Sequence, residues 1–256
     1  MARVSVKSGR DIALMRESGR IVAEVLAVVG GHVQPGVTTR ELDALAEEYI
    51  RSQGGIPAFK GYGPDRRNPF PATLCVSIDD VVVHGIPDGR RLEEGEIVSV
   101  DVGVKKDGWY GDAARTFPVG RISEEKTRLL KVTEEALQAG IARARAGNRL
   151  HDVSAAVQTH VEAAGYSVVR DLVGHGIGKQ LHEEPAVPNF GVEGTGVVLR
   201  EGMTLAIEPM VNAGTFVVHL DEDGWTVRTA DGRPSAHFEH TVAITQGEAE
   251  ILTMHG

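Results

Sequence analysis

Hydrophobic and polar positions alternate along residues 97–104, a pattern with the period of a β-strand. Valine fills every second position at the end of this stretch, whereas Asp101 lies on the opposite face. The alternation predicts a half-buried strand with one polar side. Asp107-Gly108 follows it, and this dipeptide is a strong signal for a two-residue hairpin turn.

The predicted turn fixes the register of the hairpin. A two-residue turn at these positions pairs Asp101 with Ala114 and places Asp112 diagonally across from Asp101. The two carboxylates therefore share one face of the hairpin, and their neighbours on that face include no cation. Two negative charges this close require a positive partner that the hairpin does not supply.

Helical patterns occupy two similar segments of the chain. Residues 35–55 align with residues 146–166 at an offset of 111, and each segment is typical of a capped amphipathic helix. Thr38 and Glu41 form a capping box in the first segment, and we expect Asn148 to cap the second. The similarity indicates an internal repeat.

Each of these helices follows a longer helical pattern, at about residues 9–30 and 123–146, and precedes strand-rich sequence. Two such halves, about 1–120 and 121–256, predict one α+β domain with pseudo-two-fold symmetry. We expect helices to cover the outer face of a curved antiparallel sheet. The opposite, concave face is then the natural place for a functional site.

The composition restricts the class of protein. The chain has 256 residues, is 41% hydrophobic and 25% charged, and carries a formal net charge of -9, which favours one globular domain and disfavours nucleic-acid binding. It contains neither a signal-peptide pattern nor eighteen consecutive apolar residues, so we expect a cytoplasmic protein without a membrane span. Cys75 is the only cysteine, which excludes an internal disulfide and leaves oxygen and imidazole as metal ligands.

Acids and histidines recur on the polar side of other predicted strands. Glu208 lies opposite the apolar side chains of its strand, and Glu239 and His237 lie opposite Phe238. For each strand alone, a solvated face is the simpler explanation of this pattern. The stretches concerned are 81–87, 173–185, 203–211 and 235–245.

Taken together, these acids suggest a metal centre. Asp101, Asp112, Glu208 and Glu239 with His175 would provide four carboxylates and one imidazole, a set suited to divalent ions. Two divalent cations would cancel the four negative charges and would account for the paired aspartates of the hairpin. Periodicity alone does not establish that the five side chains meet.

Five stretches together are similar to the type I methionine aminopeptidases in their short bacterial form, which have the pita-bread metallopeptidase fold. The similarity extends over about residues 8–254. It implies that the whole chain is one catalytic metallopeptidase domain. The stretches are GEIVSVDVGVKKDGWYGDAARTF, GHGIGKQLHEEP, TLAIEPMV, DGWTVRTADGRPSAHFEHTV and VVHGIP.

This resemblance assigns a role to each member of the metal set. Asp101 would bind one ion, His175 and Glu208 would bind the other, and Asp112 and Glu239 would bridge both. The cofactor would be two divalent ions, and the ligand types do not choose among cobalt, manganese, iron, zinc and nickel. The implied reaction removes N-terminal methionine from nascent polypeptides when the second residue is small, by attack of a metal-activated water on the first peptide bond.

The resemblance also implies residues that act on the substrate. Glu208 would transfer the proton of the attacking water to the departing amine. His182 would hydrogen-bond the substrate carbonyl region and the developing oxyanion, and His84 the peptide amide. The methionine pocket would be lined by Tyr62, Phe70, Cys75 and Trp225, with His84 and His182 at the reacting end.

Two features depart from the family pattern. The loop at residues 63–70 is longer than in many relatives, and Leu181 stands where an aromatic residue is frequent. The resemblance further implies a monomer that meets nascent chains, at the ribosome in the simplest case, without binding nucleic acid directly.

Other activities remain as alternatives or are disfavoured. A prolidase or aminopeptidase P shares the five ligands but typically has a further N-terminal domain, and a non-catalytic protein of this fold would not need both histidines. The glycines around His175 lack the spacing of a nucleotide-binding loop. The chain has no Gly-x-Ser-x-Gly elbow, and Cys75 has no obvious catalytic partner, which disfavours a covalent hydrolase.

Overall fold

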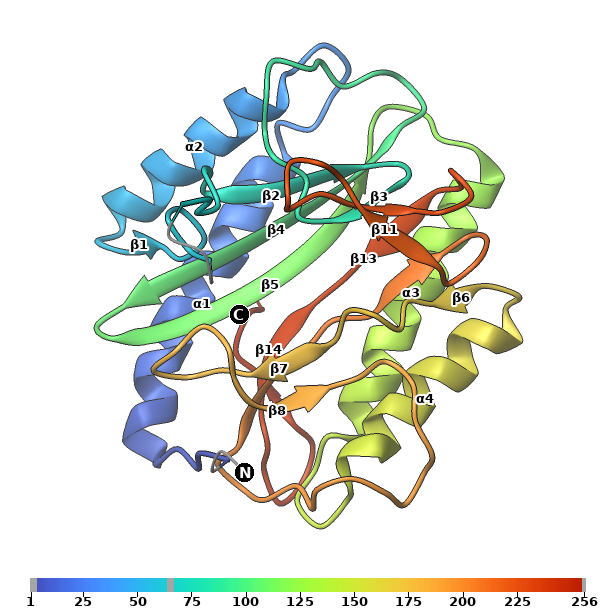
Figure 1. Cartoon of the computed structure of the whole chain (residues 1–256). Helices are drawn as coiled ribbons and strands as arrows, with labels where there is room; N and C mark the ends of the chain where they lie inside the picture. Colours follow the sequence, from blue (N-terminus) through green and yellow to red (C-terminus); the bar gives the residue numbers. More distant parts are fainter. Residues whose placement is uncertain (1–3, 64–66, 255–256) are drawn as a thin grey trace.

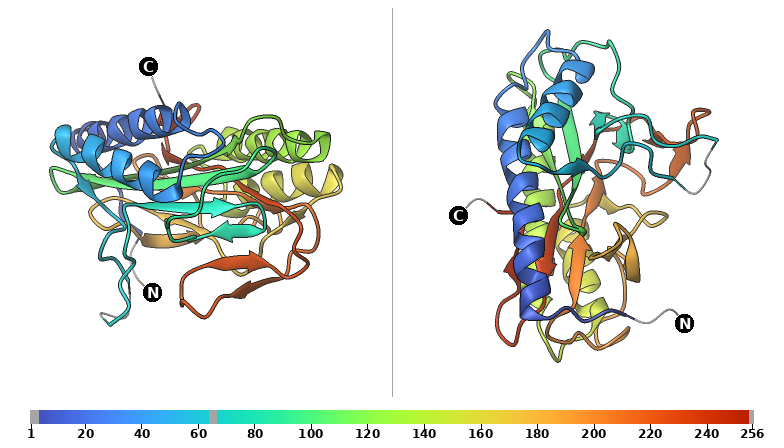
Figure 2. Two further views of the ribbon diagram at one scale, coloured as in Figure 1. Left: turned by 90° about the horizontal axis from the view of Figure 1, so that it is seen from above. Right: turned by 90° about the vertical axis from the view of Figure 1, so that its left-hand side faces the viewer.

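The computed structural model describes residues 4–63 and 67–254. Within these ranges the fold is α+β, as predicted, with helices gathered in one layer and strands in another (Figures 1 and 2). No helix in the described part has the length and apolar character that crossing a membrane requires. The helices are α1 (Gly9–Gly30), α2 (Thr39–Ser52), α3 (Glu124–Arg143) and α4 (Leu150–Ala163).

The strands form antiparallel sheets. One sheet contains β1 (Ile56–Pro57), β4 (Ile97–Lys106), β2 (Leu74–Ile78) and β5 (Trp109–Pro118), with β5 paired to β4. A second has the order β15 (Glu250–Ile251), β14 (His240–Ala243), β9 (Thr204–Ile207), β7 (Gly174–Gly176) and β8 (Glu183–Val187). The smaller sheets are β13 (Ser235–His237), β10 (Met210–Asn212) and β6 (Ser167–Val168), and β11 (Val218–Leu220), β12 (Val227–Thr229) and β3 (Val81–Val83).

The predicted hairpin register is confirmed. Strands β4 and β5 pair with Asp101 opposite Ala114, while Asp112 lies opposite Gly103. Asp107 and Gly108 both have positive φ, 49° and 86°, as a two-residue turn that follows the strand twist requires. Local turn chemistry therefore places the two aspartates diagonally on one face.

The internal repeat is visible in the helices. The bounds of α2 and α4 differ by 111 residues at both ends, the offset of the sequence alignment. Thr38 caps α2 together with Glu41, as predicted.

The predicted cap of α4 is wrong by one residue. Arg149 occupies the N-cap position, and its backbone N–H donates to Asp152 Oδ2 at 2.7 Å. The side chain of Asn148 instead donates to the carbonyl of Arg143 at the end of α3, 2.9 Å away. The Asn148 side chain thus hydrogen-bonds the C-terminal end of α3 instead of the start of α4.

The apolar core lies between the helices and the sheets. One cluster joins the buried faces of α1 and α2 to β2 and β4, and another joins α3 and α4 to β9 and β14. The two halves meet where β5 lies beside β14. There the N–H of Glu239 donates to the Ala114 carbonyl at 2.9 Å, and Asp112 exchanges hydrogen bonds with the Thr241 hydroxyl.

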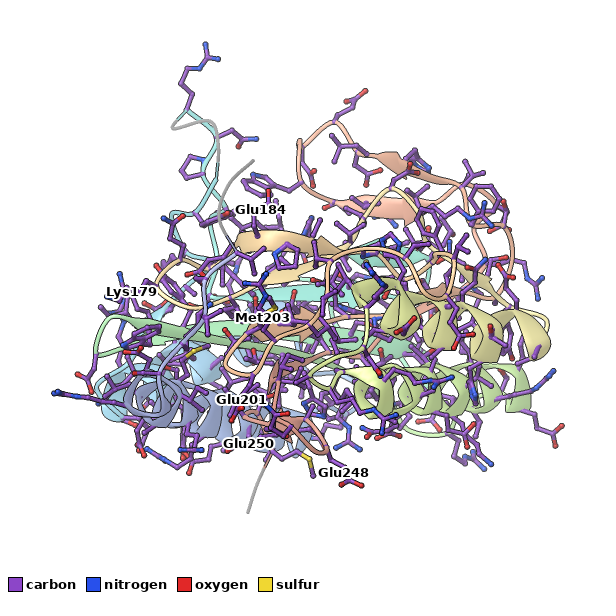
Figure 3. All side chains as sticks on the ribbon, turned by 90° about the horizontal axis from the view of Figure 1, so that it is seen from below. Lys179, Glu184, Glu201, Met203, Glu248 and Glu250 are labelled. Carbon is purple, nitrogen blue, oxygen red and sulfur yellow. The ribbon has the colours of Figure 1, made fainter. Side chains whose placement is uncertain are left out.

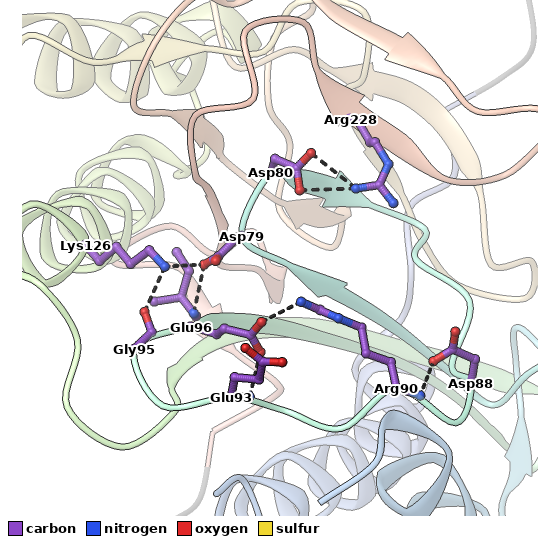
Figure 4. A network of polar contacts seen from close by, with 10 residues as sticks. Asp79, Asp80, Asp88, Arg90, Glu93, Gly95, Glu96, Lys126 and Arg228 are labelled. Atoms are coloured by element: carbon purple, nitrogen blue, oxygen red, sulfur yellow. Dashed lines mark hydrogen bonds and ion pairs between the residues drawn. The ribbon is translucent and has the colours of Figure 1, made fainter. Parts of the chain in front are cut away.

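A polar network fixes the turn between β2 and β3 (Figure 4). Lys126 of α3 contacts Asp79 Oδ1 at 2.6 Å and the Gly95 carbonyl at 2.8 Å, which ties α3 to the start of β4. Asp80 receives two hydrogen bonds from Arg228 of β12, at 3.1 and 3.2 Å. These contacts hold β12 beside β3, which directly precedes His84.

Gly111 should be intolerant of a side chain because β5 approaches α1 closely there. A Cβ at this position would lie 2.9 to 3.1 Å from backbone atoms of Ser18 and Gly19. We expect Gly111→Ala to destabilise the fold by about 1–3 kcal/mol through overpacking, measured by calorimetry. Gly89→Ala is the matched control, since nothing lies within 4 Å of its added Cβ. Equal melting temperatures for the two variants would contradict this reading of the contact.

Candidate metal centre

Strand pairing brings together the five side chains that the sequence singled out. Asp101 and Asp112 project from the β4–β5 hairpin, and His175 is the middle residue of β7. Glu208 follows β9 directly and Glu239 precedes β14 directly. Because β9 is paired with both β7 and β14, these two acids lie next to His175.

All five line one cavity of about 300 Å³. No residue of its lining belongs to a helix, which agrees with a site on the face away from the helical layer. The same cavity is lined by every other residue that the sequence assigned to the site: Tyr62, Phe70, Cys75, His84, His182 and Trp225.

The candidate ligand atoms form two overlapping groups. Atoms of Asp112, His175 and Glu239 lie within 4.8 Å of one another, and so do atoms of Glu208, His237 and Glu239. His175 Nε2 is 3.9 Å from Asp112 Oδ2 and 3.6 Å from Glu208 Oε1. Glu239 belongs to both groups, whereas Asp101 belongs to neither of them.

The buried carboxyl groups have strongly perturbed proton affinities. Burial raises the pKa of Asp101 to about 7. Burial also raises the pKa values of Asp112, Glu208 and Glu239 well above their ordinary range, and the charges of the neighbouring carboxylates raise them further. Within the described part of the chain, no lysine or arginine forms an ion pair with any of these four acids.

His175 is prepared to donate a lone pair. Burial, with His182 nearby, lowers its pKa to about 3, so the imidazole is neutral and its contacts with the acids are not ion pairs. Its Nδ1 lies 2.9 Å from the Gly176 carbonyl, which can only accept a hydrogen bond. The proton therefore resides on Nδ1, and Nε2 presents its lone pair to Asp112 and Glu208.

Several buried polar atoms of the cluster have no hydrogen-bond partner among the described residues. They are Asp101 Oδ1, Asp112 Oδ1, Glu239 Oε1 and His237 Nε2. Leaving such acceptors unpaired in the interior is costly. Carboxylate oxygens with a neutral imidazole form a donor set for a divalent cation, so the residues present fit a metal centre.

Aromatic and apolar side chains form the outer walls of the cavity. The rings of Phe70 and Trp225 meet edge to face, 5.3 Å apart. Phe70 is buried, and its N–H donates to the Tyr62 carbonyl at 2.7 Å, which closes the long loop; residues 64–66 of that loop lie outside the described residues. Leu181, the departure from the family pattern, is also buried in the lining.

Two further histidines face the cavity. The His182 ring lies 4.2 Å from that of His175, and its Nδ1 is hydrogen-bonded to the Tyr62 hydroxyl. His84 has a φ of 59°, an uncommon conformation for a residue with a side chain and one that concentrates at functional sites. Burial lowers the pKa of His84 to about 4, so it is neutral at physiological pH.

Comparison with known proteins identifies the family. Residues 13–246 match Metallopeptidase family M24. The chain is 50% identical to "Methionine aminopeptidase 1" of Bacillus subtilis over 247 residues, covering 96% of this chain and 98% of that protein. It is 52% identical to the methionine aminopeptidase of Clostridium perfringens, covering 98% and 99% of the two chains.

The chain belongs to metallopeptidase family M24. A solved structure of a methionine aminopeptidase from Thermotoga maritima matches it with a TM-score of 0.96 at 46% identity, covering 99% of this chain and all of that one. This agreement confirms the pita-bread fold with its pseudo-two-fold symmetry. Membership in M24 also implies the use of divalent metal, in agreement with the donor set of the cavity.

The M24 site contains residues that sequence reasoning did not select. His237 is fully buried, and its Nε2 lies 3.7 Å from Glu208 Oε2. The sequence pattern that could have identified His237 was its position on the same predicted strand face as Glu239. Phe59, Val83, Leu172, Val173 and Met210 complete the apolar lining, and no pattern in the sequence separates them from ordinary apolar residues.

Metal removal should make the stability of this M24 protein depend on pH in a defined direction. Raised carboxyl pKa values stabilise the folded state at low pH. The contribution of Asp101 is lost as pH rises through about 7, and those of the other three acids are lost as these groups ionise in the folded state. The buried histidines are neutral in both states above about pH 6.5, so they oppose this trend only at lower pH. Bound metal replaces the protons and removes the loss.

We therefore expect the melting temperature of chelator-treated protein to fall increasingly below that of metal-loaded protein as pH rises. Between about pH 6.5 and about pH 8.5 the difference should widen by at least about 4 °C. Calorimetry on both forms measures it, and a difference that stays constant would argue against buried, uncompensated carboxylates.

Proposed function

We propose that this chain is a dinuclear-metal aminopeptidase that removes the N-terminal methionine from nascent proteins in the cytoplasm when the second residue is small. The observation that carries the proposal is the convergence of five buried ligand side chains at one end of a cavity with aromatic walls. The methionine aminopeptidases to which the chain is similar over nearly its full length support the same reaction.

The proposed ligand assignment is the one that the resemblance implies. Asp101 would hold one ion, His175 and Glu208 would hold the other, and Asp112 and Glu239 would serve both. Glu239 contributes to both groups, and the charge of Asp101 acts on the pKa of Asp112, which supports a shared role for these two acids. When bound, the divalent ions supply Lewis acidity and make a water molecule acidic enough to lose a proton near neutral pH.

Glu208 is the proposed proton carrier. Burial raises the pKa of its carboxyl group well above the ordinary range, so it can accept a proton from water and later release it to the departing amine. It lies at the cavity floor, within 3.6 Å of His175 Nε2 and 3.7 Å of His237 Nε2. Both imidazoles are neutral and do not compete for the proton.

His182 and His84 are the proposed substrate-orienting residues. Burial raises the pKa of the Tyr62 hydroxyl, so it stays protonated and can donate to His182 Nδ1. That hydrogen bond leaves the imidazole proton on Nε2, where it can be donated to the substrate carbonyl and the developing oxyanion. His84, fixed by its backbone conformation beside Trp225, would hydrogen-bond the peptide amide.

The outer cavity suits an unbranched thioether. Tyr62, Phe70 and Trp225 provide aromatic surface, which makes favourable contacts with sulfur, and Cys75 adds a small polarisable group. Cys75 lies opposite Asp101 in the β2–β4 register, so the outer wall of the cavity adjoins the proposed metal ligands. A side chain bound here would place the first peptide bond at the proposed ions.

The proposed specificity is tested with three peptides. We expect methionine release from Met-Ala-Ser, little from Met-Leu-Ser, and no cleavage of Ala-Pro-Pro, the substrate type of the prolidase and aminopeptidase P alternatives. Excess chelator should abolish the activity because the reaction needs bound metal. Failure to release methionine with manganese, iron, cobalt and zinc alike would defeat the proposal.

Replacing His182 should separate catalysis from metal binding. We expect His182→Ala to lower kcat by about 100-fold, since one oxyanion donor is lost, while the bound metal measured by elemental analysis stays unchanged. His219→Ala is the control, because the side chain of His219 is 55% exposed and lies outside the cavity lining. Equal rates for the two variants would remove His182 from the mechanism.

A further inference from the structure

The His182 turn, residues 177–183, is held from outside the cavity by a buried ion pair. Lys7 Nζ lies 2.8 Å from Glu183 Oε2, and the two side chains are only 4% and 15% exposed. Exposed ion pairs contribute little to a structure, whereas a buried partner removed from such a pair leaves an uncompensated charge. This pair joins the N-terminal segment to the residue directly after His182.

Glu183 uses both of its carboxylate oxygens. Oε2 also accepts from the Ser5 hydroxyl at 2.6 Å, and Lys7 in turn donates to Ser5. Oε1 accepts from the backbone N–H groups of Lys179 and Gln180, at 2.8 and 3.1 Å. One carboxylate therefore links the N-terminal segment to the interior of the turn (Figure 3 labels Lys179, which lies within the turn, and Glu184, which directly follows it).

The N-terminal segment is itself anchored to the metal-bearing sheet. The N–H of Lys7 donates to the Gly202 carbonyl at 2.7 Å, just before β9, the strand that leads to Glu208. Gly178 provides the space for the Lys7 side chain, because a Cβ there would lie 2.5 Å from Lys7 Cε. The turn and the anchored segment are thus fitted to each other.

One hydrogen bond fixes the His182 ring among the described side chains. Residue 182 is exposed, the Tyr62 hydroxyl is hydrogen-bonded to the imidazole, and the ring also lies beside that of His175. The place of the ring therefore depends on the backbone of the turn. A displacement of about 1 Å at such a group can cost on the order of 100-fold in rate.

We propose that Lys7 and Glu183 are positioning residues for His182, with residues 5–7 acting as a strap that holds the His182 turn at the reacting end of the cavity. This inference rests on the proposed role of His182. It assigns a catalytic consequence to residues 5–7, none of which lines the cavity.

The test compares Lys7→Met, which keeps the length of the side chain and removes its charge, with Arg16→Met. Arg16 forms the exposed ion pair with Glu250 and does not contact the turn. We expect Lys7→Met to lower kcat by about 10-fold with KM within about 2-fold, because the turn carries a group used in the chemical step. Arg16→Met should retain both constants.

Hydrogen exchange of the peptide that spans the turn provides a readout independent of activity. We expect exchange in residues 177–183 to be about 10-fold faster in Lys7→Met than in the wild type, since the amides of Lys179 and Gln180 lose the strap that keeps their acceptor in place. Ser5→Ala, which leaves the ion pair, should show a smaller change of the same sign and serves if Lys7→Met does not fold.

A lower melting temperature with unchanged kcat and unchanged exchange in the turn would show that the ion pair is only structural and would overturn the proposal. So would unaltered kcat and exchange in Ser5→Ala, should that be the variant that folds. If the wild type releases no methionine, the proposed function fails, and the exchange measurement still decides whether the strap holds the turn.

Discussion

Burial of four carboxyl groups, with no lysine or arginine paired to them in the described part of the chain, governs the architecture of this protein. Their desolvation raises every one of their pKa values, and several of their oxygens have no hydrogen-bond donor within the described residues. A fold that places such groups together is stable only if protons or cations occupy the space between them. The ions that would neutralise these carboxylates are also the ions that would take part in the reaction. The stability of the fold and the metal chemistry of the family therefore depend on the same residues.

The fold meets this constraint with paired backbones. Asp101 and Asp112 are fixed by a hairpin register, Glu239 by a hydrogen bond from its N–H to Ala114, and His175 by its pairing with Ala206 beside Glu208. The proposed substrate-orienting residues are held differently, His84 by a strained backbone and His182 by a turn. The proposed ligands thus lie on strands or directly beside them, whereas the residues proposed to orient a substrate lie in turns, a division that functional sites commonly show.

The sequence predicted what depends on local rules. Alternation and the Asp107-Gly108 turn predicted the hairpin register, and helical patterns predicted α1 to α4 within a few positions. It did not predict interactions between distant segments. The cap of α4 was misplaced because Asn148 bonds to the preceding helix, and the approach of His237 to Glu208 depends on the meeting of two strands.

Convergence of the five proposed ligands is the clearest case of this limit. Periodicity placed each acid on a polar face but could not say that these faces meet, and only the resemblance to a known family joined them. No local pattern predicts the ion pair between Lys7 and Glu183, because its partners are 176 positions apart in the sequence. Spatial neighbours of this kind follow from the packing of the two halves and not from either segment alone.

Anomalous diffraction from crystals of the manganese-loaded protein would show directly whether the buried carboxylates hold metal. We expect two peaks about 3.5–4 Å apart, with oxygens of Asp112 and Glu239 between them and His175 beside one of them. A map in which the space among the four carboxylates holds no metal peak, or in which the ions bind elsewhere on the chain, would contradict this expectation.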